Sequence, residues 1–227
     1  MMKQVKTIVA LCLMIGAFAV QAVTPVFIKK ETSTYIIDVK YPQGFQDANV
    51  NTVVKDFIEF TKKSFYSELS EDESVASDDA GKSGLNITYS IPYEKNNALS
   101  VEFMVSIYHR GAAHPLNTVS VLNFVDGRQI ELADLFVPGA EYLKPISELS
   151  KKAITAKNIS DAKWINEGTK PVAENYHVWS FVPQGIQITF DSYQVAAYVY
   201  GPQTVVIPLS TISSLVKPDL LKTVWKH

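Results

Sequence analysis

Cysteine is almost absent from this sequence: the only one among its 227 residues is Cys12. It lies in an apolar run near the amino terminus that has the layout of a secretory leader, so we expect the mature chain to contain no thiol. A chain without thiols forms no disulfide, offers no thiolate ligand to a metal and has no cysteine nucleophile. The fold must therefore be stabilised by an ordinary packed core.

The sequence also lacks an excess of basic residues. It has 21 lysines and arginines against 23 acidic residues, a formal charge of −2, and loss of Lys3 and Lys6 with the leader leaves 19 against 23, or −4. Proteins that bind nucleic acid concentrate lysine and arginine in a patch or stripe, and this sequence has no such stripe. The composition therefore argues against nucleic acid as a partner.

A long membrane-spanning run is missing as well. Lys3 and Lys6 precede an apolar run, 8–20, after which small residues allow cleavage following Ala22 or, as the alternative, Ala19. A membrane anchor needs roughly 20 apolar residues. We therefore predict a signal peptide over residues 1–22 and a secreted or periplasmic mature chain without a membrane span. The remaining 205 residues suffice for one large domain or two small ones.

Alternation of apolar and polar residues, the pattern of half-buried strands, runs through much of the mature chain. Strands are predicted over residues 35–41, 85–91, 99–107, 119–125, 129–132, 196–200 and 204–208, with a further hairpin over 176–190. Asp126–Gly127 and Pro183–Gly185 are typical of tight hairpin turns. Consecutive strands should therefore pair antiparallel.

Apolar residues at steps of three and four predict two longer helices. The first covers Val50–Phe65, with Asp47 or Asn49 as its cap, and the second covers Leu143–Ile154, with Pro145 in its first turn. Each helix should cover a sheet with its apolar stripe.

Shorter helical segments are predicted at 133–136 and 212–221, while 158–174 is either a short helix or a long connection. The acidic stretch 67–84 is typical of a solvated loop, because its carboxylates lack the order of a calcium loop. The predicted class is α+β: an antiparallel sheet of hairpin-linked strands covered by two or three helices.

Three stretches of the second half together resemble a known domain: GAAHP, NFVDGRQIELADLF and FVPQGIQITFDSYQVAAYVYGPQTVVIPLS. They are similar to the uncharacterised domain of the extracellular region of anti-sigma-V factor, a lysozyme sensor, and of the N-terminal region of a secreted peptidoglycan deacetylase. The preceding TYIIDVKYP, with its helix, and ITYSIPY resemble the smaller domain that accompanies it.

The resemblance implies a smaller α+β part over 23–98, a C-terminal α+β domain over 99–227 and a setting near the cell wall. We expect the wall-side module alone, because the sequence shows neither the membrane span and cytoplasmic tail of the sensor nor a following deacetylase domain. In the sensor this module binds lysozyme. The resemblance therefore implies a binder of a lysozyme-like protein or of wall fragments.

Histidines suggest a possible chemistry. His109 and His114 flank a loop, RGAA, and His177 precedes a later strand. Three imidazoles could hold zinc and leave a position for water, as in metal-dependent hydrolases. The spacing does not favour this, because positions 109 and 114 straddle a turn instead of sharing one face of a helix. The other interpretation is structural: Gly111 allows a sharp reversal, and His114 bonds the backbone across it.

A second loop, within FDSYQVAAYVYG, carries tyrosines, which offer a large contact area and a hydroxyl group. Packing of these tyrosines at a sheet edge is the alternative. No G-x-S-x-G motif supports serine hydrolysis, and Asp126 and Asp134 are explained by a turn and a helix cap. The predicted binding residues lie in loops 106–117 and 190–198: His109, Arg110, His114, Asp191, Tyr193 and Tyr198.

The first hypothesis is a non-catalytic binding module of the cell envelope, without a cofactor, that recognises a lysozyme-like protein or peptidoglycan. The mature charge of −4 favours a basic partner such as lysozyme, although weakly at physiological salt. One alternative is a metal-assisted hydrolase that acts on cell-wall material through the three histidines. The other is a structural envelope protein without a ligand.

Overall fold

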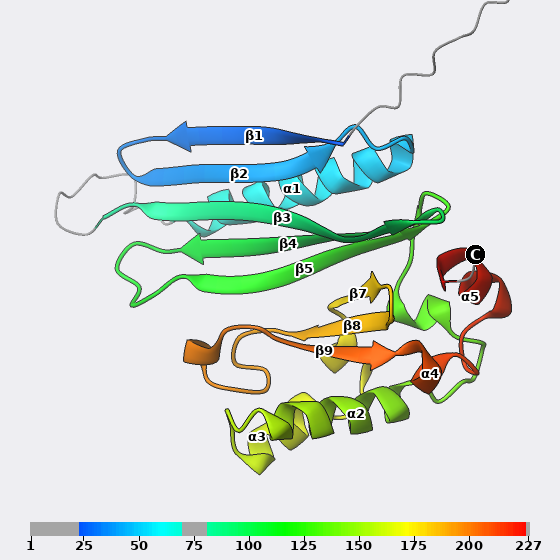
Figure 1. The fold of residues 1–227 in the computed structure, drawn as a ribbon. Helices are drawn as coiled ribbons and strands as arrows, with labels where there is room; N and C mark the ends of the chain where they lie inside the picture. Colours follow the sequence, from blue (N-terminus) through cyan, green and yellow to red (C-terminus); the bar gives the residue numbers. More distant parts are fainter. Residues whose placement is uncertain (1–22, 70–80, 226–227) are drawn as a thin grey trace, which may run out of the picture.

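The computed structural model describes residues 23–69 and 81–225, which form two sheets (Figure 1). The second sheet meets the first through one of its edge strands, and the longer helices lie on the sides away from this contact. The predicted signal peptide and most of the predicted acidic loop lie outside the described residues. The predicted α+β class is confirmed, but the strands form two sheets instead of one. The first sheet has six strands and the second has three.

The strands of the first sheet are paired in the order of the sequence. They are β1 (Thr24–Glu31), β2 (Tyr35–Gln43), β3 (Ser83–Lys95), β4 (Ala98–Tyr108), β5 (Leu116–Val125) and β6 (Arg128–Gln129). This sheet includes strands on both sides of residue 98, where the sequence suggested a division between two parts. Strand β1 was not predicted, because most of its residues are exposed and show no alternation.

One pairing in this sheet differs from the expected hairpins. Strands β2 and β3 are parallel, because helix α1 (Ala48–Glu68) lies between them in the chain and runs back along the sheet. The buried face of α1 is the predicted stripe, and its core contacts include Ile37, Ile87 and Phe103. Asp47 caps the helix, since its Oδ1 accepts hydrogen bonds from the amides of Asn49 and Val50 at 2.7 and 3.3 Å.

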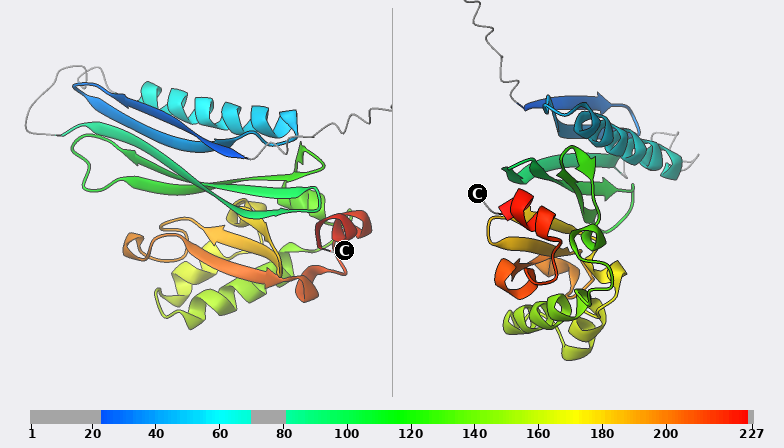
Figure 2. Two further views of the ribbon diagram at one scale, coloured as in Figure 1. Left: turned by 45° about the horizontal axis from the view of Figure 1, so that its top comes forward. Right: turned by 90° about the vertical axis from the view of Figure 1, so that its right-hand side faces the viewer.

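The second sheet is antiparallel, in the order β7 (Trp179–Val182), β8 (Gly185–Phe190) and β9 (Gln203–Pro208). Helices α2 (Leu143–Ala156) and α3 (Ala162–Gly168) lie on the side of this sheet away from the first one (Figure 2). Short 3-10 turns precede the sheet and interrupt it: η2 (Leu132–Leu135), η3 (Ala173–Tyr176) and η4 (Tyr198–Tyr200). The turn at η2 was predicted, but its cap is Glu131, whose amide donates to Asp134 Oδ2 at 2.9 Å.

Two predictions for the last fifty residues were wrong. Residues 196–200 are not a strand that pairs with 204–208: they contain η4, and β9 pairs with β8 instead. The alternation was misleading, because Val195 and Ala196 are both buried while Val199 is exposed. The predicted terminal helix is two helices, α4 (Leu209–Ile212) and α5 (Pro218–Trp225), of which the second begins at a proline.

A buried polar network joins the two sheets. Ser100 Oγ donates to Asn123 Oδ1 at 2.6 Å, and Asn123 Nδ2 donates to the carbonyl of Trp179 at 2.8 Å. The amide of Phe181 donates to Ser100 Oγ at 2.8 Å. These bonds satisfy outward-facing backbone groups of β7, an edge strand of its sheet, with side chains of the first sheet. The two sheets are therefore fixed in one relative position.

The carboxyl-terminal helix adds a second connection. Tyr93 on β3 donates its hydroxyl to the carbonyl of Val224 at 2.5 Å, and Trp225 Nε1 donates to the carbonyl of Val182 at 3.0 Å. Burial raises the pKa of the Tyr93 phenol, so its hydroxyl stays protonated as a donor. Both bonds tie α5 to the place where the sheets meet.

Candidate functional site

The two loops that the sequence singled out lie against each other, at the same end of the two sheets (Figure 1). The ring of His114 stacks on that of Tyr198, with ring centroids 4.0 Å apart and planes at 20°. The hydroxyl of Tyr193 lies 3.3 Å from Nε2 of the same histidine. The rings of Tyr193 and Tyr198 are 5.5 Å apart at 30°. We call His114, Tyr193 and Tyr198 the aromatic cluster.

Two of the predicted binding residues hold the loops together. Tyr198 donates its hydroxyl to the carbonyl of Pro115 at 2.8 Å and accepts a bond from Asn117 Nδ2 at 2.9 Å. Asp191 Oδ1 accepts a bond from the amide of Val119 at 2.9 Å. The polar atoms of Asp191 and Tyr198 therefore connect the second sheet's loop to strand β5 and the residues before it.

Tyr193 is held in an unusual backbone conformation. Its φ angle is +71°, in the left-handed region that a bulky residue rarely adopts. Trp164 Nε1 donates to the carbonyl of Tyr193 at 2.8 Å, and the neighbouring Gln194 donates its side-chain amide to the carbonyls of Gly168 and Asn175. Yet 48% of the tyrosine is exposed. A strained backbone that the surrounding structure holds in place, with the side chain exposed, is typical of functional positions.

Further exposed apolar side chains lie in the same two loops. Leu116 is 54% exposed, Val199 is 83% exposed, and Tyr200 is as exposed as Tyr193. Val199 and Tyr200 belong to η4, directly after Tyr198 of the cluster. These residues surround the aromatic cluster with surface that a ligand or partner protein could cover.

His109 and Arg110 contact other elements. His109 Nε2 lies 3.2 Å from Glu68 Oε2, at the end of α1, and the amide of Arg110 donates to Ser83 Oγ at 2.9 Å. These bonds fix the start of the β4–β5 loop to the neighbouring helix and strand. The structure thus brings three of the predicted residues into one cluster. Asp191 supports the loop that carries two of them through its bond to Val119, and His109 contacts α1 instead.

The alternative zinc site is not formed by the described residues. Nδ1 of His114 contacts the carbonyl of Pro115 at 3.0 Å, and Nδ1 of His177 contacts that of Glu174 at 2.7 Å. Within residues 23–69 and 81–225, no group of three histidine, aspartate or glutamate side chains is placed to hold a metal. Each of the three histidines instead bonds a different neighbour.

A half-buried carboxyl group lies elsewhere on the first sheet. Burial raises the pKa of Glu102 on β4, and this effect is opposed by a hydrogen bond with Ser90 on β3, its partner in the strand pairing. Perturbed carboxyls are frequent in active sites but also occur in structural networks. Among the described residues, Ser90 is the hydrogen-bond partner of Glu102, and no histidine contacts this carboxyl group.

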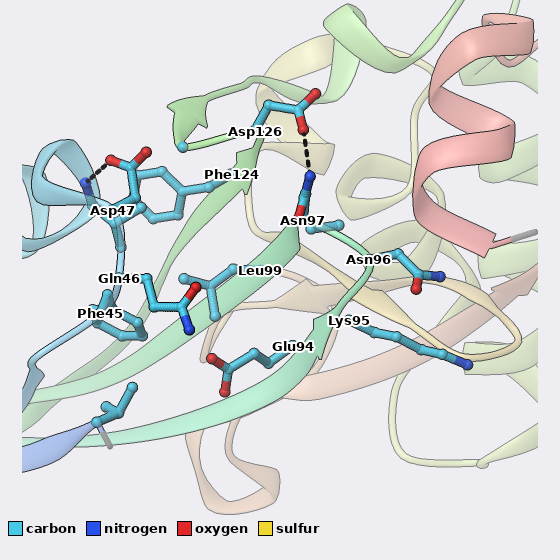
Figure 3. Close-up of a pocket in the computed structure, with 14 residues that line it drawn as sticks. Phe45, Gln46, Asp47, Glu94, Lys95, Asn96, Asn97, Leu99, Phe124 and Asp126 are labelled. Carbon is cyan, nitrogen blue, oxygen red and sulfur yellow. Dashed lines mark hydrogen bonds between the residues drawn. The ribbon is translucent and has the colours of Figure 1, made fainter. Parts of the chain in front are cut away.

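No pattern in the sequence indicated a pocket of about 780 Å³, which lies at the opposite end of the first sheet. Four parts of the chain line it: Val23 before β1, the loop before α1 with the first turn of that helix, the β3–β4 turn and the β5–β6 turn (Figure 3). Its lining combines buried apolar side chains with exposed carboxylates and amides. Sequence reasoning missed it because its residues come from turns, each of which had a sufficient local explanation.

Comparison with known proteins gives one family-model match in each half of the chain. Residues 133–210 match the family model described as "Protein of unknown function (DUF3298)". Residues 28–117 match the model described as "Deacetylase PdaC". The resemblance predicted from the sequence is therefore confirmed.

A curated relative and two solved structures extend this result. The chain is 27% identical, over 195 residues, to the peptidoglycan-N-acetylmuramic acid deacetylase PdaC of Bacillus subtilis (strain 168), and the match covers 83% of this chain. The match spans 40% of the length of that relative. A DUF3298 family protein from Pseudomonas aeruginosa PAO1 has the same fold, with a TM-score of 0.68 at 14% identity over 88% of this chain and 96% of the other.

A second DUF3298 family structure, from Bacteroides fragilis NCTC 9343, gives a TM-score of 0.58 at 16% identity, over 89% of this chain and 96% of the other. These likenesses show the fold. The two family matches divide the aromatic cluster: Tyr193 and Tyr198 lie in the part that matches the DUF3298 model, whereas His114 lies in the part that matches the PdaC model. No helix in the described part of the chain is long and apolar enough to cross a membrane.

Proposed function

We propose that this protein is a non-catalytic binding module of the cell envelope that recognises peptidoglycan through the aromatic cluster. The observation that carries the proposal is Tyr193, a half-exposed tyrosine held at a left-handed φ beside two further aromatic rings. A rigid aromatic surface suits the apolar faces of sugar rings, and tyrosine hydroxyls bond to sugar hydroxyl groups. Rigidity also lowers the entropy lost on binding.

The comparisons support the class of ligand. The curated relative is named as an enzyme that acts on peptidoglycan, and the likeness covers most of this chain. A shared region that is only part of a wall enzyme is well suited to hold a protein on the wall. The same likeness supports a location outside the cytoplasm, secreted or periplasmic, as the leader predicts.

The chemistry of the cluster supports binding over catalysis. Both ring nitrogens of His114 contact protein oxygens, since Nδ1 faces the Pro115 carbonyl and Nε2 faces the Tyr193 hydroxyl. The Tyr198 hydroxyl and the Asp191 carboxylate are engaged in the bonds between the loops. These polar atoms already have partners within the protein. The exposed rings, in contrast, are available for contact.

Replacing Tyr193 by asparagine tests the proposal. Asparagine tolerates a left-handed φ, so the free energy of unfolding should change by less than about 1 kcal/mol. Loss of the exposed ring should weaken binding to purified, enzymatically undigested cell walls by about tenfold or more. Co-sedimentation with a concentration series of walls measures the affinity. Tyr66→Asn, at a tyrosine on α1 that is 39% exposed, is the matched control and should bind as the unaltered chain does.

Two outcomes would contradict the proposal. One is equal wall binding by the unaltered chain and the Tyr193 variant, with both folded. The other is the release of soluble fragments or acetate from walls by the purified protein, which would show catalysis. A lysozyme-like protein is the other partner predicted from the sequence. The same variants, measured by calorimetry against lysozyme, would show whether the aromatic cluster takes a protein in place of the glycan.

A further inference from the structure

We infer that the pocket in Figure 3 is a second ligand site and that it takes an amino sugar whose amino group carries no acetyl group. The inference rests on the proposed function for its setting at the cell wall. It uses none of the residues of the aromatic cluster, and its own residues lie around the start of α1 and the turns β3–β4 and β5–β6. The two sites can therefore be tested separately.

The size and floor of the pocket suit a sugar ring. Its volume of about 780 Å³ lies within the range of pockets that bind small molecules. Phe45, Leu99 and Phe124 form an apolar floor together with Val50, and all four are at least nine-tenths buried. One face of a hexose ring presents mainly C–H groups, so it can cover apolar surface while its hydroxyls face outward. The floor therefore fits the less polar side of a sugar.

The floor is fixed before any ligand arrives. Asn51 Oδ1 accepts hydrogen bonds from the amides of Gly44 and Phe45 at 2.9 and 3.0 Å, and Asn51 Nδ2 donates to the Phe45 carbonyl at 2.7 Å. On the other side, Asn97 Nδ2 donates to Asp126 Oδ1 at 3.0 Å, which joins the two turns. Asn49 Nδ2 donates to the Gly127 carbonyl at 2.8 Å and joins α1 to the β5–β6 turn. These bonds join the start of α1 to the β5–β6 turn, and that turn to the β3–β4 turn.

The polar groups at the rim point to a donor-rich ligand. Gln46 and Glu94 extend over the floor from opposite sides (Figure 3). Within the described residues neither side chain has a hydrogen bond or ion pair, so both can bind a ligand. Asp47 and Asp126 each use a carboxylate oxygen in a bond within the protein. Ionised carboxylates only accept hydrogen bonds, so the rim needs hydroxyl or ammonium donors.

The charge of the lining decides between acetylated and free amino sugars. Asp47, Glu94 and Asp126 contribute three negative charges, while the Lys95 side chain extends away from them (Figure 3). An anionic rim repels the carboxylate of muramic acid and phosphate groups, and it attracts an ammonium group. An acetylated amino group is uncharged and has a single N–H donor. The pocket therefore fits a glucosamine-type sugar after removal of its acetyl group.

Calorimetry with soluble oligosaccharides tests this site. The probes are a glucosamine tetramer and an N-acetylglucosamine tetramer, at a mildly acidic pH where the amine is charged. The glucosamine tetramer should bind with one-to-one stoichiometry and about tenfold or more tightly than the acetylated one. Glu94→Gln should remove most of that preference, because it removes a charge and keeps the shape. Glu174→Gln, at an exposed glutamate outside the lining, should retain it.

Three results would overturn the inference. The first is equal affinity for the two tetramers. The second is that the folded protein binds neither tetramer at millimolar concentration. The third is that tetralysine binds as tightly as the glucosamine tetramer, which would show that the pocket responds to charge alone. Tyr193→Asn should leave glucosamine binding unchanged. If the protein bound cell walls but showed no preference for the glucosamine tetramer, only the inference about the pocket would be wrong. If it bound the glucosamine tetramer but not cell walls, only the role proposed for the aromatic cluster would be wrong.

Discussion

Replacing Asn123 by alanine is expected to lower the free energy of unfolding by about 3 kcal/mol, because the change leaves two buried groups without partners. Only 2% of Asn123 is exposed. Without its side chain, the Ser100 hydroxyl loses its acceptor and the Trp179 carbonyl loses its donor. Both groups lie between the sheets, where water cannot replace the amide without entering the core. Urea unfolding, followed by tryptophan fluorescence, measures the loss.

The matched control is Asn86→Ala. Asn86 Nδ2 also donates to a backbone carbonyl, that of Asp38 at 3.2 Å, but this bond is exposed to solvent. Water can replace it, so the expected loss is below about 0.5 kcal/mol. If both variants lost the same amount of stability, the network around Asn123 would not be what joins the sheets.

Replacing Gly168 by alanine should have an effect of similar size and should also affect binding. A Cβ at this position would lie 2.1 Å from the carbonyl oxygen of Gln194 and 2.8 Å from Val195 Cγ1. Helix α3 or the 190–198 loop must then move, and overpacking of this kind typically costs about 1–3 kcal/mol. Because this loop carries Tyr193, binding to cell walls should weaken as well. Thermal unfolding and wall co-sedimentation measure the two effects.

Gly84→Ala is the control for this variant. Gly84 lies on β3, and the nearest atom to an added Cβ is the Ile36 carbonyl oxygen at 3.9 Å, an ordinary contact. The Gly84 variant should keep both its stability and its wall binding. Retention of full wall binding by a destabilised Gly168 variant would argue against the loop as part of the binding surface.

Much of the fold could be predicted because its elements have local causes. The stripe from Val50 to Phe65 and the cap at Asp47 determine α1 without reference to the rest of the chain. The Asp126–Gly127 turn, with φ angles of +50° and +73°, specifies its hairpin in the same way. The parallel pairing of β2 with β3 depends instead on where the chain returns after α1, which no local pattern records.

The candidate site was predictable only in part. The two loops were identified separately, from the GAAHP turn and from the tyrosines, but the stacking of His114 on Tyr198 depends on how the second sheet packs against the first. The same packing lets the Asp191 carboxylate accept a hydrogen bond from the amide of Val119, which fixes the 190–198 loop to β5. The pocket was missed for a related reason: Asp47 and Asp126 were explained by a cap and a turn, and the space between them exists only in the folded protein.

The most direct test of the central claim, that the aromatic cluster is a peptidoglycan-binding surface, is an NMR titration of the isotope-labelled protein. The ligand is a soluble peptidoglycan fragment in which every amino sugar is N-acetylated, so that the pocket of Figure 3 binds it only weakly. We expect the largest amide shifts at residues 112–118 and 191–200, with a saturable dependence on concentration. Shifts concentrated elsewhere on the chain, or none at millimolar fragment, would contradict the account.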